Sequence, residues 1–191
     1  MPTLNLQVSA SADDANEFAG TVSITANGAA NDATTDWDGV RFQNVTIPQG
    51  ATIVSAVAQF AVFATLDDPS HTVYGEDVDN AAAFAVASNN ISGRSRTSAT
   101  VAWSSTGLGA DDTTFFSPPA VTAIVQEIVN RAGWVSGNAL ALLINGSADA
   151  NRDLGVATYD WDPALAAKLD ITYSIPRAIR SVYHHLVGGM R

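Results

Sequence analysis

The sequence predicts an all-β protein, an antiparallel β-sandwich of jelly-roll type with one short α-helix and a C-terminal extension. Residues 40–45, VRFQNV, alternate apolar and polar side chains, which is the pattern of a strand with one buried face. Many short apolar stretches follow one another, separated by loops rich in Gly, Pro, Asn and Asp. This succession of short strands and turns is typical of sandwiches and jelly rolls.

Residues 35–64 form the centre of the predicted fold. The strand at 40–45 leads into a turn at 47–50, IPQG, in which Pro48 suits the first inner position and Gly50 can adopt a positive φ. A long apolar run with few charges follows this turn. We therefore predict two core strands here, one of which could be buried on both faces.

The remaining strands follow from the same alternation or from short apolar runs bounded by loop residues. Residues 138–144, NALALLI, do not alternate, so we predict that this strand is buried on both faces. The region 78–98 is rich in Ala, Ser and Asn, with Phe84, Val86 and Ile91 as predicted inward-facing anchors. The other strands are predicted at 4–8, 21–25, 72–75, 99–103, 154–158 and 168–174.

One segment changes to a helical period. Between 118 and 131 the apolar residues recur every three to four positions, which predicts a helix with one buried face. Ser117 is placed to be its N-cap, Pro118 its first residue and Gly133 its stop. The apolar positions are Val121, Ile124, Val125, Ile128 and Val129.

The charge divides the chain into an acidic domain, residues 1–174, and a basic arm, residues 175–191. The net charge is −10; the domain holds all 19 acidic residues and six of the nine Lys and Arg residues, giving −13, and the arm carries +3. A domain with this much negative charge repels phosphate groups. Nucleic acid is therefore not an expected partner. No apolar run has membrane length, and no membrane span is expected.

The arm is predicted to dock on a neighbouring protein subunit, for which an acidic sister subunit is one candidate. Pro176 ends the domain, and the apolar residues after it fall on one face of a short helix. The basic residues would meet acids of the partner. The docking residues are Arg177, Ile179, Arg180, Val182, Tyr183 and Leu186.

The chain contains no cysteine, so it forms neither disulfides nor thiolate metal sites. Its start, MPTLN, lacks the charged and apolar regions of a signal peptide. Three expectations are compatible with this start: the protein stays inside the cell, leaves by another route such as lysis, or is a mature fragment.

Five stretches carry a family resemblance: GVRFQNVTIPQGATIVSAVAQF, VYGEDVDNAAAF, ISGRSRTSATVAW, IVQEIVNRAGWVSGNALALLI and LDITY. In order and spacing they resemble the DNRLRE-type, disaggregatase-related jelly rolls of bacterial extracellular and surface proteins. The resemblance covers about two thirds of the chain. It implies a fold like that of carbohydrate-binding modules, without a single ligand or a catalytic signature. In those bacterial proteins the jelly-roll domain is usually an accessory to another domain, whereas here it makes up nearly the whole chain.

Jelly rolls of the carbohydrate-binding type often hold a structural Ca²⁺ where the first and last strands meet, so the resemblance suggests a Ca²⁺ site. Asp14 and Glu17, in a predicted loop between the first two strands, and Asp170, on the closing strand, are the candidate ligands. Ca²⁺ takes six to eight hard oxygens, including carboxylates. The alternative is that these acids are solvated and keep the protein soluble.

Two Asp-Trp-Asp triplets, 36–38 and 160–162, form a candidate carbohydrate-binding site. A Trp ring can stack on a sugar while carboxylates accept hydrogen bonds from its hydroxyls. The alternative is that both rings cover the ends of the sandwich while the Asp residues make turns. The candidate residues are Trp37, Asp38, Trp161 and Asp162.

Other charged residues are expected to be structural. Glu76, Asp77 and Asp79 follow a strand and are expected to cap it and form turns rather than bind a cation. The bases expected to form ion pairs with the acidic surface are Arg94, Arg96 and Arg131.

The sequence predicts no enzymatic activity. It has no HExxH, Walker or Gly-x-Ser-x-Gly motif and no thiol nucleophile, and two of its three histidines, His184 and His185, are in the arm. Carboxylates are plentiful enough for a glycosidase pair, but no spacing brings two of them together.

We therefore expect a non-enzymatic structural and adhesion protein. Its nearly single-domain chain, without a secretion signal and with a basic arm, fits a bacteriophage virion component: a capsid decoration, spike or tail-associated subunit anchored by residues 175–191. The alternative is a Ca²⁺-dependent carbohydrate-binding module of a secreted bacterial protein. In either case a host-surface glycan is a possible partner.

Overall fold

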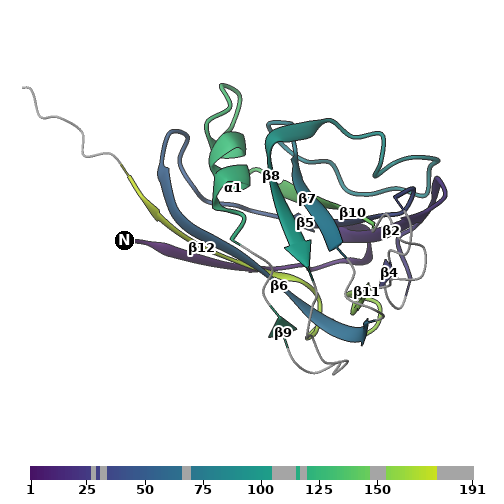
Figure 1. Ribbon diagram of the computed structural model, residues 1–191. Coiled ribbons are helices and arrows are strands. Elements are labelled where there is room, and N and C mark those ends of the chain that lie inside the picture. Colours follow the sequence, from purple (N-terminus) through teal and green to yellow (C-terminus); the bar gives the residue numbers. More distant parts are fainter. Residues whose placement is uncertain are drawn as a thin grey trace, which may run out of the picture.

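In the part of the chain that the structure describes, two antiparallel sheets pack together with one α-helix (Figure 1), as expected for an all-β sandwich. The computed structural model describes residues 1–26, 29–30, 34–65, 70–104, 115–116, 120–146 and 154–175. Among these residues, no helix is long and apolar enough to cross a membrane.

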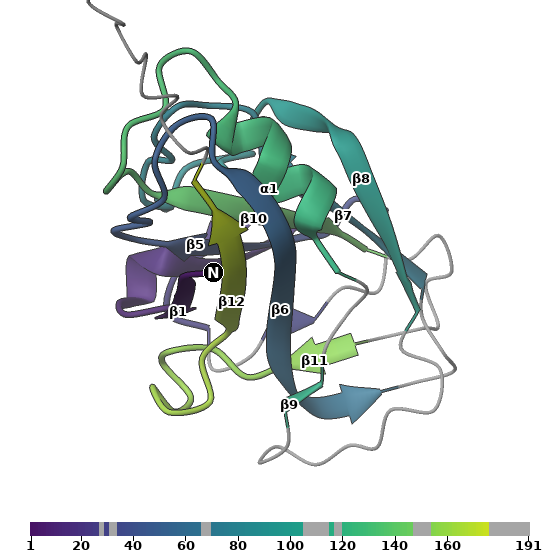
Figure 2. The ribbon, with the colours of Figure 1, turned by 90° about the vertical axis from the view of Figure 1, so that its left-hand side faces the viewer.

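The first sheet has the strand order β1-β12-β6-β11-β4, and β9 also pairs with β6. Figure 2 faces this sheet and shows β12 between β1 and the long, bent β6. Its strands are β1 (Thr3–Gln7), β4 (Ala29–Ala30), β6 (Thr52–Thr65), β9 (Phe115–Phe116), β11 (Leu154–Val156) and β12 (Lys168–Ser174).

The second sheet has the strand order β3-β2-β5-β10-β7-β8. A short 3-10 helix, η1 (Ser11–Asp13), leads into it. Its strands are β2 (Asp14–Phe18), β3 (Thr21–Ser23), β5 (Trp37–Phe42), β7 (Ser70–Glu76), β8 (Arg96–Ser104) and β10 (Leu140–Asn145).

The strand pairs are nested in the jelly-roll manner. The outermost pair is β1 with β12, and inside it come β5 with β10, β6 with β9 and β7 with β8. The pairs β1·β12 and β6·β9 lie in the first sheet, and the pairs β5·β10 and β7·β8 lie in the second. The chain therefore behaves as one long hairpin folded over on itself, which is the arrangement that two Greek keys produce.

The main core lies between the sheets, and a second, smaller core lies on the outer face of the second sheet. Leu140, Leu142 and Ile144 belong to the first core, whereas Ala141 and Leu143 belong to the second. The strand predicted to be buried on both faces is therefore confirmed, and its lack of alternation has a simple cause. Both of its faces are apolar because each is covered.

The cover over the outer face is the connection between β7 and β8, residues 77–95, which we call the covering loop (Figure 1). Phe84 and Ile91 are buried in it, as predicted. The ring of Phe84 lies so close to Gly39 of β5 that a Cβ at that position would overlap it. Val86 is instead 73% exposed, because a tight turn from Ala85 to Ala87 directs it outward.

Arg94 holds the covering loop in place. Its Nη1 lies 2.7 Å from Glu76 Oε2, and the two side chains are 8% and 9% exposed. The guanidinium also donates to the carbonyls of Ala82 and Ala83 and lies 4.2 Å from the centre of the Phe84 ring. The predicted ion pairing of this arginine is confirmed, but the pair is buried rather than on the surface. Arg131 pairs with Asp77 and Asp79.

The predicted helix is confirmed as α1 (Thr122–Val129), which packs against β6, β7 and β8 with its apolar side inward. It begins later than predicted because the preceding residue pairs with β6. The N–H of Val121 donates to the Ala56 carbonyl at 2.9 Å, and the Thr122 hydroxyl accepts from the N–H of Ala56 at 3.0 Å. The helix ends before Gly133, and residues 117–119 lie outside the described part of the chain.

One predicted loop is a strand. Residues 14–18 form β2, which pairs with β5 and β3, so Asp14 and Glu17 lie on a strand and not in a loop. The strand was missed because polar side chains occupy both of its faces. These side chains form hydrogen bonds with distant segments of the chain, and the hydrophobic pattern of the sequence gives no sign of such bonds.

Replacing Phe84 with alanine should lower the free energy of unfolding by about 3–5 kcal/mol, the usual cost of emptying a buried aromatic site. Val86→Ala, in the same loop but exposed, should change it by less than about 0.5 kcal/mol. Urea unfolding of both variants measures the difference. Equal effects at the two positions would contradict a second core beneath the covering loop.

Candidate functional site

An open cleft lies on the outer face of the second sheet, between the β2–β3 turn and the covering loop. Its volume is about 380 Å³. We call it the outer cleft. It is lined by Glu17, Ala19, Gly20, Thr35, Trp37, Asn89 and Ser92.

The local backbone sets the walls of the outer cleft. Glu17 of β2 and Trp37 of β5 are direct cross-strand partners, so their side chains share the outer face. The turn after β2 needs positive φ at Gly20, and a Cβ there would lie 2.7 Å from the Asn89 side-chain oxygen. Asn89, itself at φ 56°, donates its N–H to the Gly20 carbonyl at 3.0 Å. The turn and the covering loop therefore face each other at a fixed separation.

Glu17 forms the floor of the outer cleft and is 0% exposed. Its Oε2 accepts the backbone N–H groups of Ile91 at 2.8 Å and Ser92 at 3.0 Å, which fastens the covering loop to β2. Its Oε1 is buried as well, and no hydrogen-bond donor reaches it within the part of the chain that the structure describes. Buried acceptors are usually satisfied, so this oxygen is an exception that calls for a partner.

Trp37 forms an apolar wall of the outer cleft. The guanidinium of Arg96 lies 4.9 Å from the centre of the Trp37 ring, within the range of a cation–π interaction. The ring of Tyr74 is 5.9 Å away, and Arg96 lies over it too. These contacts hold the Trp37 ring in place.

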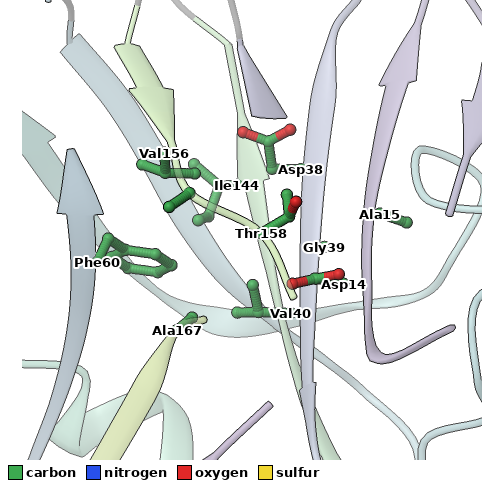
Figure 3. A pocket seen from close by; sticks show the side chains of 11 residues that line it. Asp14, Ala15, Asp38, Gly39, Val40, Phe60, Ile144, Val156, Thr158 and Ala167 are labelled. Atoms are coloured by element: carbon green, nitrogen blue, oxygen red, sulfur yellow. The ribbon is translucent and has the colours of Figure 1, made fainter. Parts of the chain in front are cut away.

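A second polar group lies inside the sandwich. Asp14 and Asp38 are buried and line a small cavity between the sheets, together with the apolar residues Val40, Phe60 and Val156 (Figure 3). Its volume of about 10 Å³ is roughly that of one water molecule. Both carboxylates have partners. Asp14 Oδ2 accepts the N–H of Tyr159 at 2.7 Å, and Asp38 Oδ1 accepts from the Asn16 amide at 3.1 Å.

The pKa of Asp14 is raised from 3.8 to about 7, chiefly by burial. The nearby carboxylates of Asp160 and Asp13 contribute to the rise, whereas the hydrogen bond from Tyr159 opposes it. Asp13 is itself paired with Arg41, and Asp160 accepts from the Ser11 hydroxyl at 3.0 Å. Asp14 is therefore a carboxyl group that gains or loses its proton near neutral pH.

The structure does not bring the three predicted Ca²⁺ ligands together. Asp14 faces the inter-sheet space, Glu17 faces the outer cleft, and Asp170 lies on the first sheet, where it accepts from Asn5 and Gln59. Among the described residues, no group of three His, Cys, Asp or Glu side chains is arranged to hold a metal ion. The Ca²⁺ site stays a prediction.

The two Asp-Trp-Asp triplets have different surroundings. Trp37 is only 8% exposed and faces the outer cleft, whereas Asp38 faces the opposite, inner side of the sheet. Trp161 is 41% exposed and lies in the loop before β12. In that loop Asp162 accepts the N–H of Ala164 at 2.8 Å, the turn role that was the alternative interpretation. Carbohydrate binding by these residues stays a prediction.

Most residues of the outer cleft carry no local sequence signal. Thr35, Asn89 and Ser92 come from two long connections whose composition indicates only loop structure. Glu17 was singled out, but as a metal ligand at the meeting of the first and last strands. The one available signal was the pair of asparagines at 89–90, because Asn tolerates the positive φ found at Asn89.

Comparison with known proteins adds no relative. The sequence matches no protein-family model, and none of the curated proteins is significantly similar to it. The resemblance to DNRLRE-type domains thus rests on the sequence motifs alone and stays a prediction.

Asp14→Asn is expected to change how stability depends on pH. Because folding raises the pKa from 3.8 to about 7, Asp14 contributes stability that is complete below pH 3.8 and is lost as the pH rises to 7. The variant should therefore gain stability relative to the wild type over this interval, by up to about 4 kcal/mol. Urea unfolding at a series of pH values measures the difference.

Asp162→Asn is the matched control, since it removes a carboxylate from an exposed turn. A difference between wild type and Asp14→Asn that stays constant from pH 4 to pH 8 would contradict the raised pKa.

Proposed function

We propose that this chain is a non-enzymatic structural and adhesion protein. The sandwich, residues 1–174, presents a binding surface, and residues 175–191 anchor it to a neighbouring protein subunit. One observation supports this division most directly. The first and last strands pair with each other, and the N–H of Tyr173 donates to the Pro2 carbonyl at 3.1 Å. The last described strand, β12, therefore lies beside the first strand and ends at Ser174, which supports a domain that ends there.

Charge supports the anchoring role. The sandwich carries −13 and the arm +3, so the arm is attracted to any surface as acidic as the sandwich itself, including another copy of it. The predicted docking residues lie outside the described part of the chain. A virion is the setting we propose, with the protein as a capsid decoration, spike or tail-associated subunit. The support is the basic arm, in which the chain departs from the domains that it resembles.

Deleting residues 175–191 should leave a folded sandwich that no longer associates, because β12 is complete at Ser174. Circular dichroism and the thermal midpoint should match those of the full chain. Analytical ultracentrifugation should show that the full chain associates and the truncated chain does not. Salt should weaken the association of the full chain, because it screens exposed charges. As a control, Arg177→Gln and Arg180→Gln together keep the apolar residues and remove two charges. A truncated chain that still associates would refute the anchoring role.

A second candidate function is that of a Ca²⁺-dependent carbohydrate-binding module of a secreted bacterial protein. The outer cleft favours a binding role, since it combines hydroxyl, amide and carboxylate groups with the wall formed by Trp37. The Ca²⁺ requirement rests on the sequence resemblance alone.

A glycan array probed with and without a chelator separates these candidates. The module predicts binding to a defined host-surface glycan that the chelator abolishes. Binding that survives the chelator supports adhesion without Ca²⁺. The absence of glycan binding favours the purely structural role.

A further inference from the structure

We infer that the outer cleft binds a neutral, hydroxyl-bearing ligand, a single saccharide unit, and that Glu17 Oε1 accepts a hydrogen bond from it. This inference rests on the adhesive function proposed above. It adds the chemistry of the ligand and the residue that recognises it.

Glu17 Oε1 is a buried acceptor without a hydrogen-bond donor among the described residues. An ionised carboxylate can accept about four hydrogen bonds, and Glu17 uses only Oε2, for the two N–H groups of the covering loop. Within the described chain, no donor reaches Oε1, which is buried, and Glu17 is one of the residues that line the outer cleft. Leaving such an acceptor unpaired costs free energy that an entering donor recovers. The missing partner is therefore an O–H or N–H group of the ligand.

The charge of Arg96 favours a neutral donor over a cationic one. The guanidinium of Arg96 donates to the Ser92 carbonyl at 3.3 Å and lies over Trp37, so a positive charge already stands beside the outer cleft. A cationic ligand would be repelled by it. A neutral hydroxyl group donates to Glu17 without this repulsion.

The other polar groups of the outer cleft suit the hydroxyls of a sugar. The hydroxyls of Thr35 and Ser92 and the amide of Asn89 are uncharged and can both donate and accept. Adjacent hydroxyls of a sugar have the same dual character. The volume of about 380 Å³ falls within the usual range for small-ligand sites, and the Trp37 wall suits the C–H face of a sugar. A saccharide unit matches both the size and the polarity.

The cleft is also formed in advance. The N–H of Asn89 donates to Gly20, and the N–H of Gly93 donates to the Asn89 carbonyl at 2.9 Å, so backbone hydrogen bonds hold the covering-loop wall. A ligand therefore does not have to order this loop, and its contacts count fully toward affinity.

The test uses Glu17→Gln in the full chain. The glutamine carbonyl can keep the hydrogen bonds to Ile91 and Ser92, while its amide nitrogen replaces Oε1 and turns an acceptor into a donor. Saccharide binding should weaken at least about tenfold, the usual effect of losing a hydrogen bond to a charged group. Asn89→Gly is a second variant, which tolerates the φ of 56° and removes the amide from the cleft. It should weaken binding as well.

Glu127→Gln is the matched control. This carboxylate also accepts two backbone N–H groups, from Ser98 at 2.8 Å and Ala99 at 2.7 Å, but it lies on α1 and does not line the outer cleft. It tests the effect of removing a carboxylate that braces the backbone. Saccharide affinity should be unchanged.

The probes are methyl hexosides and methyl N-acetylhexosaminides, with putrescine as the cationic comparison. Their binding is followed by NMR through the amide signals of Ile91 and Ser92 and the indole signal of Trp37. At least one glycoside should shift these signals in the full chain, and putrescine should not.

Three results would overturn the inference. They are no shift with any glycoside, equal glycoside affinity in wild type and a folded Glu17→Gln variant, and stronger binding of putrescine than of every glycoside. The anchoring role is decided separately by the deletion of residues 175–191, so either proposal can fail alone.

Discussion

Ala141 and Leu143 of β10 pack against the covering loop, while Leu140 and Leu142 pack against the first sheet. A loop that covers one face of a sheet has buried backbone N–H and C=O groups that need hydrogen-bond partners. It lacks the regular inter-strand hydrogen bonds that supply such partners within a sheet. Buried charged side chains take over that task. Arg94 donates to loop carbonyls, and Glu17 accepts loop N–H groups.

The outer cleft follows from this solution. The carboxylate that fastens the loop has two oxygens. The loop uses only one, and the other is buried without a donor among the described residues, in a side chain that lines the outer cleft. The same strand places Asp14 on its inner face, where burial favours the protonated carboxyl. Alternation along β2 thus separates two functions of a carboxyl group: Asp14 as a proton-sensitive element of the core and Glu17 as an acceptor facing outward.

Much of the fold could be predicted from apolar patterns. The turn at 47–50, the helix period and the unbroken run in β10 are local signals that the tertiary structure reinforces. Predictions went wrong where polar residues are buried or where a contact from elsewhere decides. Residues 14–18 form a strand without hydrophobic alternation, Val86 is turned outward by its neighbours, and pairing with Ala56 delays the start of α1.

Hydrophobic period and charge are properties of neighbouring residues, so the class of fold and the contrast between an acidic domain and a basic arm can be derived from the amino-acid sequence. Which polar residues meet depends instead on the tertiary structure. Glu17 and Ser92 are far apart along the chain, and Glu17 and Trp37 become partners through strand register. Such juxtapositions depend on how sheets pair and loops fold back, which residue order alone does not encode in any local pattern.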